Sequence, residues 1–358
     1  MRLSSFKTVL LCITFILLSS LHSPADVAHK DEIAIEVMAK EKMHHRKDGR
    51  FSNPWCHDCQ KSFFDFLKWK FSSNEYSSKK EEQPHIPLEK PDIKKLEASG
   101  KDWFIWLGHS SVMMKIGDKH LITDPVFEGA TIFVDRETPF PIDVDELPKL
   151  DYILISHGHY DHLDTDTLTM LNEKFSPQVI SGPGYEDYLS SIGIKKRIPL
   201  DWWESYDDGE ISIRSLPAQH WSKRTLFDSY GMLWCSFIIA SGEKSYYWLG
   251  DGGYFRGFKE IGDKFGPFDI TFLPIGAYEP RWFMKSHHMS PGEALMAAKG
   301  LKSQMLIPIH WGTFDLSNEP LDLPPEEVKE EHYPFRNDFE LKILPIGGVH
   351  MVRPSKKN

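Results

Sequence analysis

The sequence feature that most constrains this chain is the segment HGHYDH at residues 157–162, which brings together four side chains able to bind metal. The apolar run YILI precedes it and predicts a short buried strand, so the segment lies on the loop at that strand's carboxyl end. Imidazole and carboxylate groups suit zinc, iron or manganese. His157 and His159 can face one ion while Asp161 and His162 face a neighbouring one. The pattern favours a two-metal hydrolytic site over a histidine-rich surface loop.

Composition sets the outer limits of the prediction. The chain has 358 residues, of which 41% are hydrophobic and 13% aromatic, and this is ample for a sizeable core. The length alone would allow two domains. A formal net charge of -10 argues against nucleic acid as a partner, because a phosphate backbone selects basic surfaces.

The first 25 residues have the features of a secretory signal. Arg2 and Lys7 supply positive charge, residues 9–18 form an apolar run, and residues 23–25 offer a small-x-small cleavage site. The apolar run is short for a membrane span, although an uncleaved anchor is left open. We therefore expect an exported protein that is periplasmic or membrane-associated.

Cysteine usage agrees with export. Cys56 and Cys59 form a C-x-x-C pair, for which an oxidising compartment favours a disulfide, with two free thiols as the alternative. A structural zinc site needs about four ligands, and the sequence has no second C-x-x-C to complete one. Cys235 lies in an apolar run and is predicted to be a core residue rather than a nucleophile.

Residues 26–100 are predicted to be an N-terminal extension, charged and irregular, with a linker over 72–91. Within it, residues 63–71 predict a short helix with a broad apolar face. That face comprises Phe63, Phe64, Phe66, Leu67 and Phe71, roughly opposite Lys61, Asp65 and Lys68. The helix either enters a lipid interface or packs on the main body or on a second copy of the chain, so a homodimer is left open.

Residues 101–358 are predicted to be one domain that carries the metal chemistry. Short strands recur through this region, and a helix is predicted over residues 165–175. Several of the strands end on or near a histidine or an aspartate, namely His157, His220, Asp251 and His310. If these separated segments meet at one end of a pair of sheets, the region is a single domain.

The donors can be divided between two ions. One ion would bind His157, His159 and His220, and the other would bind Asp161, His162 and His310. Asp251, which stands among glycines, would bridge the two ions with one carboxylate. We expect two Zn²⁺ ions, with iron or manganese as alternatives.

Imidazole ligands also need partners that fix their tautomers. Asp124, at the end of an expected strand, is the best candidate for this role, although an aspartate before proline can also be a simple turn residue.

Longer peptides resemble one family within the metallo-β-lactamase superfamily, the N-acylphosphatidylethanolamine-hydrolysing phospholipases D. The HGHYDH segment resembles the superfamily pattern, and the longer peptides resemble the family. They are WLGHS (106–110), TDP (123–125), LDWWE (200–204), QHWSKRTL (219–226), GDKFGPFD (262–269), PIGAYEPRWFMK (274–285) and IHWGTF (309–314). Two upstream peptides, DGRF (48–51) and NPW (53–55), extend the resemblance, which covers roughly residues 45–350.

The resemblance implies an αββα sandwich, in which two mixed sheets pack together with helices on their outer faces. It implies two zinc ions and a phosphodiesterase that hydrolyses a membrane phospholipid to phosphatidic acid and an N-acylethanolamine. By the same resemblance, Tyr160 and His288 contact the substrate and Asp124 is an active-site carboxylate. Alternatively, His288 lies at the entry to a helix and has no chemical role.

The chain also departs from the family pattern. Gly158 stands where the animal enzymes carry a polar residue, the segment DGG at 251–253 is looser than their pattern, and His287 replaces a glutamine. The signal segment suggests an exported bacterial relative. A lactonase, another carbonyl hydrolase of the superfamily, and a non-catalytic protein that binds a membrane surface are the alternative functions.

Overall fold

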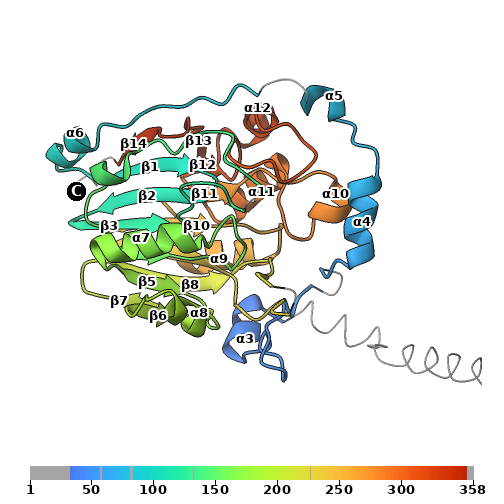
Figure 1. Cartoon of the computed structure of the whole chain (residues 1–358), viewed down its shortest axis with the longest axis horizontal. Coiled ribbons are helices and arrows are strands. Elements are labelled where there is room, and N and C mark those ends of the chain that lie inside the picture. Colours follow the sequence, from blue (N-terminus) through green and yellow to red (C-terminus); the bar gives the residue numbers. More distant parts are fainter. Residues whose placement is uncertain (1–32, 57–58, 81–83, 132, 226, 353–358) are drawn as a thin grey trace, which may run out of the picture.

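Two β-sheets form the centre of the molecule (Figure 1). The computed structural model describes residues 33–56, 59–80, 84–131, 133–225 and 227–352. The first sheet has the strand order β14-β1-β2-β3-β4-β5-β6, and the second has the order β13-β12-β11-β10-β9-β8-β7. Parallel and antiparallel pairs occur in both sheets, as expected for the αββα arrangement.

The two halves of the chain supply one sheet each, apart from the last strand. The first sheet contains β1 (Trp103–Gly108), β2 (Ser111–Ile116), β3 (Lys119–Thr123), β4 (Tyr152–Leu154), β5 (Gln178–Ser181), β6 (Arg197–Pro199) and β14 (Val349–Met351). The second contains β7 (Ser205–Asp207), β8 (Ser212–Pro217), β9 (Cys235–Ser241), β10 (Lys244–Leu249), β11 (Ile270–Pro274), β12 (Met305–Ile309) and β13 (Glu340–Leu341).

Strand direction decides where the functional side chains gather. In the first sheet, β3 pairs in parallel with β4, while β1 is antiparallel to β2 and β2 to β3, so β1, β3 and β4 run the same way. In the second sheet, the same reasoning makes β8, β10 and β12 run the same way. The carboxyl ends of these six strands therefore point to one edge of their sheets.

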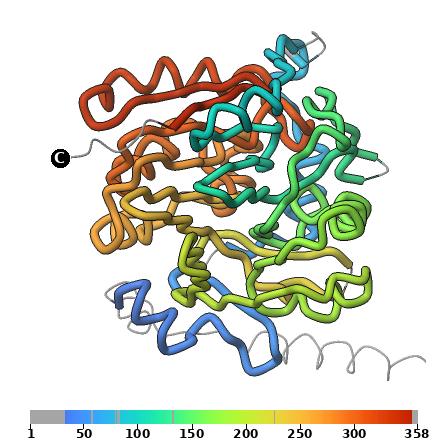
Figure 2. The backbone as a smooth tube through the Cα atoms, turned by 90° about the vertical axis from the view of Figure 1, so that its left-hand side faces the viewer, coloured from blue at the N-terminus to red at the C-terminus, as the bar shows by residue number. Residues whose placement is uncertain are grey.

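Helices cover the outer faces of both sheets, and side-chain alternation explains why. Along β1, Phe104 and Trp106 pack in the core between the sheets, whereas Trp103, Ile105 and Leu107 pack against the helices outside the first sheet. Figure 2 shows α7 in green and α9 and α11 in orange on opposite sides of the molecule. The predicted fold is confirmed.

The helices of the domain have defined places. On the first sheet lie α6 (Ile93–Ala98), α7 (Thr165–Phe175) and α8 (Glu186–Ser191), and on the second lie α9 (Gly257–Phe265), α11 (Pro291–Gly300) and α12 (Leu323–Glu331). The short helices are α3 (Ile35–Lys40), α4 (Phe63–Phe71), α5 (Ser77–Lys80), α10 (Arg281–Met284), η1 (Val144–Glu146) and η2 (Tyr333–Phe335).

Local sequence signals predicted some of these elements well. Helix α7 has the predicted bounds, and the Asp164 side chain caps it by accepting from the backbone N–H of Thr167. Helix α4 also has its predicted bounds, and Ser62 and Asp65 form a capping box at its start. Helix α9 was not predicted, because glycines interrupt its helical pattern.

The N-terminal extension is part of the same folded body. Ile35 and Met38 of α3 are fully buried. Together with Phe51 and Trp55 they belong to the same hydrophobic core as residues of both sheets. The predicted linker contains the one-turn helix α5. The predicted secretory signal lies outside the described residues. Among the described residues, no helix is both long enough and apolar enough to cross a membrane.

Candidate metal centre

The predicted donors converge at one edge of the two sheets. The first sheet contributes the segment that follows β4, and the second contributes His220 after β8, Asp251 after β10 and His310 after β12. Within the second sheet, β8, β10 and β12 run the same way, so the segments of His220, Asp251 and His310 leave that sheet at the same end.

The first donor group contains the three histidines assigned to one ion. The Nε2 atom of His157 lies 2.8 Å from Nδ1 of His159, and Nε2 of His220 lies 3.2 Å from the same Nδ1. His157 and His220 are fully enclosed, and His159 is half-buried. Three imidazole nitrogens that face a common point match the donor set of a zinc ion.

The second donor group contains one residue more than predicted. Nε2 of His310 lies 3.3 Å from Nε2 of His162, and Oδ2 of Asp161 lies 3.3 Å from the same atom. His109 joins them, with its Nε2 3.2 Å from Nε2 of His162 and 2.9 Å from Oδ2 of Asp161. Four donors therefore face one another in this group.

Asp251 lies between the two groups, as a bridging ligand must. Its Oδ2 is 3.5 Å from Nε2 of His220 in the first group and 3.4 Å from Nε2 of His310 in the second. The same oxygen lies 3.1 Å from Nδ1 of His288. One carboxylate oxygen thus reaches both donor groups, and the residues present fit a pair of cations.

A layer of hydrogen bonds orients the donors. Oδ2 of Asp124 lies 2.6 Å from Nδ1 of His162, and Oδ1 of Asp124 accepts from the backbone N–H of Ser156 at 2.7 Å. His220 directs its Nδ1 toward the backbone oxygen of His287 at 3.0 Å, which leaves Nε2 for a metal. Asp124 therefore orients the ring of His162, and this contact is the one that its predicted role requires.

Burial and charge set the protonation of the histidines. Burial lowers the pKa of His159 to about 4 and also lowers the pKa values of His157 and His220, so these rings are neutral at neutral pH. Burial acts in the same direction on His162, but the charges of Asp161 and Asp124 outweigh it and raise its pKa to about 10. The neutral rings of the first group are in the state that metal binding requires, whereas His162 in the second group would release its proton on binding a cation.

The backbone around the centre adopts unusual conformations. His109, Asp124 and His310 have φ angles of 48°, 33° and 67°, in the left-handed region that such residues rarely enter. Gly158 allows a close approach, because a Cβ there would lie 2.6 Å from Oγ of Ser222. The tertiary structure imposes these conformations at the site.

The residues that the family resemblance connects with substrate lie at the edge of the centre. His288 is close to Asp251 and its side chain is 18% exposed. Tyr160 is 44% exposed, and its hydroxyl donates to the backbone oxygen of Arg224 at 2.7 Å instead of facing the donors.

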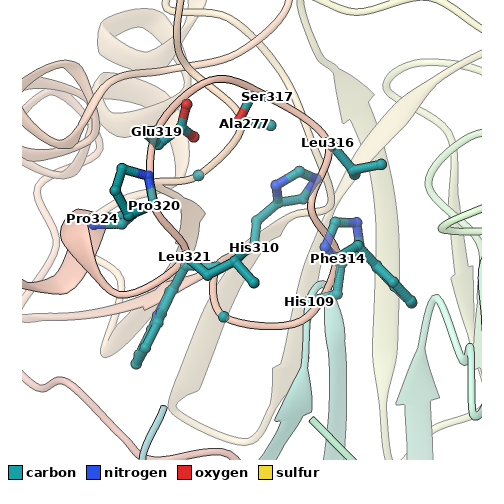
Figure 3. A pocket seen from close by; sticks show the side chains of 13 residues that line it. His109, Ala277, His310, Phe314, Leu316, Ser317, Glu319, Pro320, Leu321 and Pro324 are labelled. Carbon is teal, nitrogen blue, oxygen red and sulfur yellow. The ribbon is translucent and has the colours of Figure 1, made fainter. Parts of the chain in front are cut away.

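A small pocket opens beside the second donor group (Figure 3). His109 and His310 form part of its wall, together with Ala277 and Phe314. Glu319 also lines the pocket, but its carboxylate accepts from the backbone N–H groups of Tyr278 and Glu279 at 3.1 and 3.0 Å. His109 and His310 of the second group thus border this small pocket.

The sequence analysis missed His109 and the pair of His44 and His45. His109 directly follows β1, so the rule that found the other donors at strand ends would have found it as well. His44 and His45 lie outside the metal centre and face Asp201, each with Nε2 2.7 Å from a carboxylate oxygen. No local pattern connects these two histidines with an aspartate that stands more than 150 residues later.

The cysteine predictions can be compared with the structure as well. Cys56 and Cys59 form a disulfide, the favoured one of the two alternatives. Cys235 is buried in the core, as predicted, and burial raises the pKa of its thiol to about 12.

Comparisons with known proteins agree with this geometry. Residues 119–311 match the model of the Beta-lactamase superfamily domain. The N-acyl-phosphatidylethanolamine-hydrolyzing phospholipase D 1 of Caenorhabditis elegans is 36% identical over 252 residues, which are 66% of this chain and 70% of that protein. An uncharacterised protein of Mycobacterium tuberculosis is 32% identical over 325 residues, which are 87% of this chain and 86% of that protein.

A solved structure supports the fold independently. A metallo hydrolase from the archaeon Ignicoccus hospitalis superposes with a TM-score of 0.56 at 20% identity, over 71% of this chain and 100% of that one. At this identity the likeness concerns the fold alone, whereas the matches in sequence concern the family. The chain therefore belongs to the metallo-β-lactamase superfamily, within it to the family of the N-acylphosphatidylethanolamine-hydrolysing phospholipases D, and it is a metal-dependent hydrolase.

Proposed function

We propose that this protein is a binuclear phosphodiesterase that hydrolyses N-acylphosphatidylethanolamine-type phospholipids to phosphatidic acid and an N-acylethanolamine. The observation that carries the proposal is the position of Asp251 Oδ2, within 3.5 Å of donors from both groups. Two zinc ions are the proposed cofactors, because imidazole and carboxylate donors suit zinc, and iron or manganese would suit the same set. When bound, such a pair supplies a nucleophilic water at neutral pH and stabilises negative charge on a phosphoryl group.

The surrounding residues have separate tasks in this proposal. Asp124 and the His287 carbonyl hold the rings of His162 and His220 in one tautomer. His288 would bind the phosphate or protonate the departing oxygen, since its Nδ1 lies 3.1 Å from Asp251 and its ring is partly exposed. Arg281 donates to the backbone oxygen of His288 at 3.2 Å and thereby helps to position it.

Helix α4 supports a membrane lipid as the substrate. It lies beside α10, where the rings of Trp69 and Phe283 stack with centroids 5.0 Å apart (Figure 1). Trp69 is therefore a buried contact of the helix with the body. Helix α10 leads into residues 286–288 of the metal centre, so α4 lies close to the site along the chain path.

The outer face of α4 combines aromatic rings with positive charge. Its exposed rings are Phe63 at 70%, Phe64 at 78%, Phe66 at 40% and Phe71 at 85% exposure. Lys61 and Lys68 flank the partly exposed Trp282, the former donating to its backbone oxygen and the latter 4.6 Å from its ring centroid. Apolar rings with lysines at their border suit an interface with anionic lipid. In this proposal the protein is exported and works at a membrane surface, as a monomer or a homodimer.

The experiment compares three classes of substrate. Purified protein, loaded with zinc, is incubated with N-acylphosphatidylethanolamine in mixed vesicles, with a bis-aryl phosphodiester and with a panel of lactones, and products are identified by mass spectrometry. We expect phosphatidic acid and N-acylethanolamine in equal amounts, and the same products lost in the Asp251→Asn variant. Turnover of the lactones without any phosphodiester cleavage would replace the proposal with the carbonyl-hydrolase alternative.

A further inference from the structure

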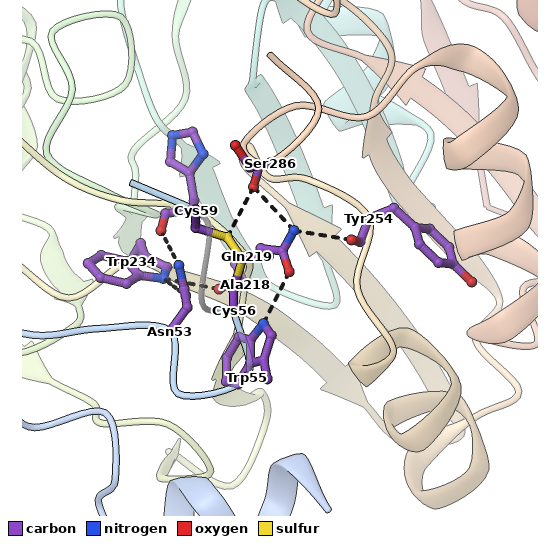
Figure 4. The surroundings of a disulfide bond; sticks show 10 residues. Asn53, Trp55, Cys56, Cys59, Ala218, Gln219, Trp234, Tyr254 and Ser286 are labelled. Atoms are coloured by element: carbon purple, nitrogen blue, oxygen red, sulfur yellow. Dashed lines mark hydrogen bonds between the residues drawn. A yellow bond between two sulfur atoms is a disulfide. The ribbon is translucent and has the colours of Figure 1, made fainter. Parts of the chain in front are cut away.

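A strap from the N-terminal extension, residues 51–56 together with Cys59, lies beside Gln219 and Ser286, the neighbours in sequence of His220 and His287 (Figure 4). It contains the NPW segment whose resemblance to the family carried no assigned role. The strap is built of buried residues, since Phe51, Trp55 and Cys59 are at most 8% exposed. The strap contacts the two chain segments that carry His220 and His288.

Asn53 links the strap to the segment of His220. Its amide nitrogen donates to the backbone oxygen of His220 at 2.8 Å, and its amide oxygen accepts from the indole nitrogen of Trp234 at 2.9 Å. The same indole nitrogen also lies 3.0 Å from the backbone oxygen of Ala218. Trp234 therefore keeps a partner when Asn53 is replaced, whereas the buried carbonyl of His220 loses its donor.

Gln219 connects the strap to the segment of His288. Its Oε1 accepts from the indole nitrogen of Trp55 at 3.2 Å, and its Nε2 donates at 3.2 Å to the backbone oxygens of both Tyr254 and Ser286. Ser286 stands two residues before His288. One side chain thus joins the strap, the chain beyond Asp251 and the segment of His288.

The disulfide closes the strap against the same segment. Sγ of Cys59 lies 3.9 Å from the backbone oxygen of Ser286, and Cys56 packs against the central core. The next residue, His287, supplies the carbonyl that orients His220. The disulfide is therefore in contact with the segment whose carbonyl orients this histidine.

We propose that the strap is a positioning element of the metal centre, and that the Cys56–Cys59 disulfide makes the affinity of the first donor group for metal depend on oxidation. This inference rests on the proposed function only in taking the centre to be a metal site. Reduction by a phosphine consumes one water, converts the disulfide to two thiols and oxidises the phosphine to its oxide. The two free thiols no longer hold Cys59 against Ser286, so the 286–288 segment loses one of its contacts, next to the carbonyl that orients His220.

The test measures metal retention rather than turnover. Zinc-loaded protein is titrated with a chromophoric chelator before and after treatment with a water-soluble phosphine, and titration of free thiols verifies that the two cysteines have been released. We expect one of the two ions to be lost at about 10- to 100-fold lower chelator concentration after reduction, the range typical for loss of groups that support metal ligands. Unchanged retention of both ions, with the two thiols released, would overturn the proposal.

Variants separate this role from a general effect on folding. The double variant Cys56→Ser/Cys59→Ser should lose the same ion early and should no longer respond to the phosphine. Asn53→Ala should also lose that ion early, although it keeps the disulfide. Asn172→Ala serves as its control, because Asn172 also donates its amide to a backbone oxygen, that of Gly193, far from the centre. An equal loss of metal in Asn53→Ala and Asn172→Ala would contradict a positioning role.

The proposed reaction can fail without affecting this test. If no phospholipid is hydrolysed but the phosphine still releases one ion early, the reaction is wrong and the strap inference stands. If hydrolysis occurs at the same rate and with the same metal content in reduced protein, the strap inference is wrong and the reaction stands.

Discussion

Two clusters of histidine and aspartate in this molecule look alike in composition and differ in geometry. In the metal centre, ring nitrogens face one another, as in the 2.8 Å separation between His157 and His159. In the distal cluster of His44, His45 and Asp201, each ring nitrogen instead faces a carboxylate oxygen at 2.7 Å. Two imidazole nitrogens come that close when a cation or a shared proton lies between them, whereas nitrogen and oxygen at 2.7 Å form an ordinary charge-assisted hydrogen bond.

The surroundings of the distal cluster agree with this distinction. The ammonium group of Lys42 lies 3.4 Å from Oδ2 of Asp201, so this carboxylate has a positively charged neighbour besides the two histidines. His44 stacks on Trp202 with ring centroids 4.1 Å apart, and its ring is fully buried. The distal cluster thus fastens the N-terminal extension to the domain, and residue types alone do not make a metal site.

The largest expected effect comes from exchanging one carboxylate for an amide in each cluster. Asp251→Asn should lower hydrolytic activity on the order of 1,000-fold, because the bridging charge is lost between both donor groups. Asp201→Asn should leave activity within about twofold, because its cluster holds no reacting group. Steady-state rates with metal content measured alongside decide this, and similar losses in the two variants would erase the distinction between the clusters.

Metal removal should also separate the two clusters. A chelator should destabilise the wild-type protein by about 3 kcal/mol when the metal had been present at a hundred times its dissociation constant, because binding stabilises only the folded state. The Asp251→Asn variant should respond less, and Asp201→Asn should respond like the wild type. Thermal unfolding with and without chelator provides the comparison; a weakened response in Asp201→Asn would indicate that the distal cluster binds metal too.

A smaller effect is expected on the stability of the distal cluster itself. Asp201→Asn should destabilise the folded protein by about 1–3 kcal/mol, since the charged partner of two histidines is lost while His44 stays buried. Denaturant unfolding of the metal-loaded protein measures this change. A change below about 0.5 kcal/mol would mean that the extension is held by its apolar contacts alone.

The smallest expected effect concerns pH. Burial lowers the pKa of His44, although its bond with Asp201 acts in the opposite direction. Below the unfolded pKa of about 6.5, the unfolded chain takes up a proton that the folded chain does not, so the contribution of His44 to stability falls as the pH falls. The stability difference between wild type and His44→Gln should therefore decrease from pH 7.5 to pH 5, by at most about 1.4 kcal/mol per pH unit. The pKa of Asp201 is lowered well below its ordinary value, so Asp201 remains charged throughout this window. A pH-independent difference would contradict the assigned protonation.

Short-range patterns were sufficient for much of the fold and of the donor set. The apolar run before residues 157–162 predicted that this segment is a loop at the end of a strand. His220, Asp251 and His310 were recognised because each follows an apolar strand. Helices α4 and α7 were predicted to the residue, since their caps and periodicity are local. Helix α9 was not, because glycine disfavours a helix locally, and only the packing shows why Gly262 is there: a Cβ would lie 2.1 Å from the backbone oxygen of Gly300 at the end of α11.

The sequence by itself determined the chemistry available to this protein: a set of histidines and aspartates at the ends of apolar strands, and a family resemblance over most of the chain. Only the tertiary structure decided which of those residues meet. It brought His109 into the second donor group, placed Asp201 against His44 and His45, and set the strap beside His220. The reason is physical: these contacts depend on strand direction and on packing between segments far apart in the chain, and neither leaves a periodic or local trace in the sequence.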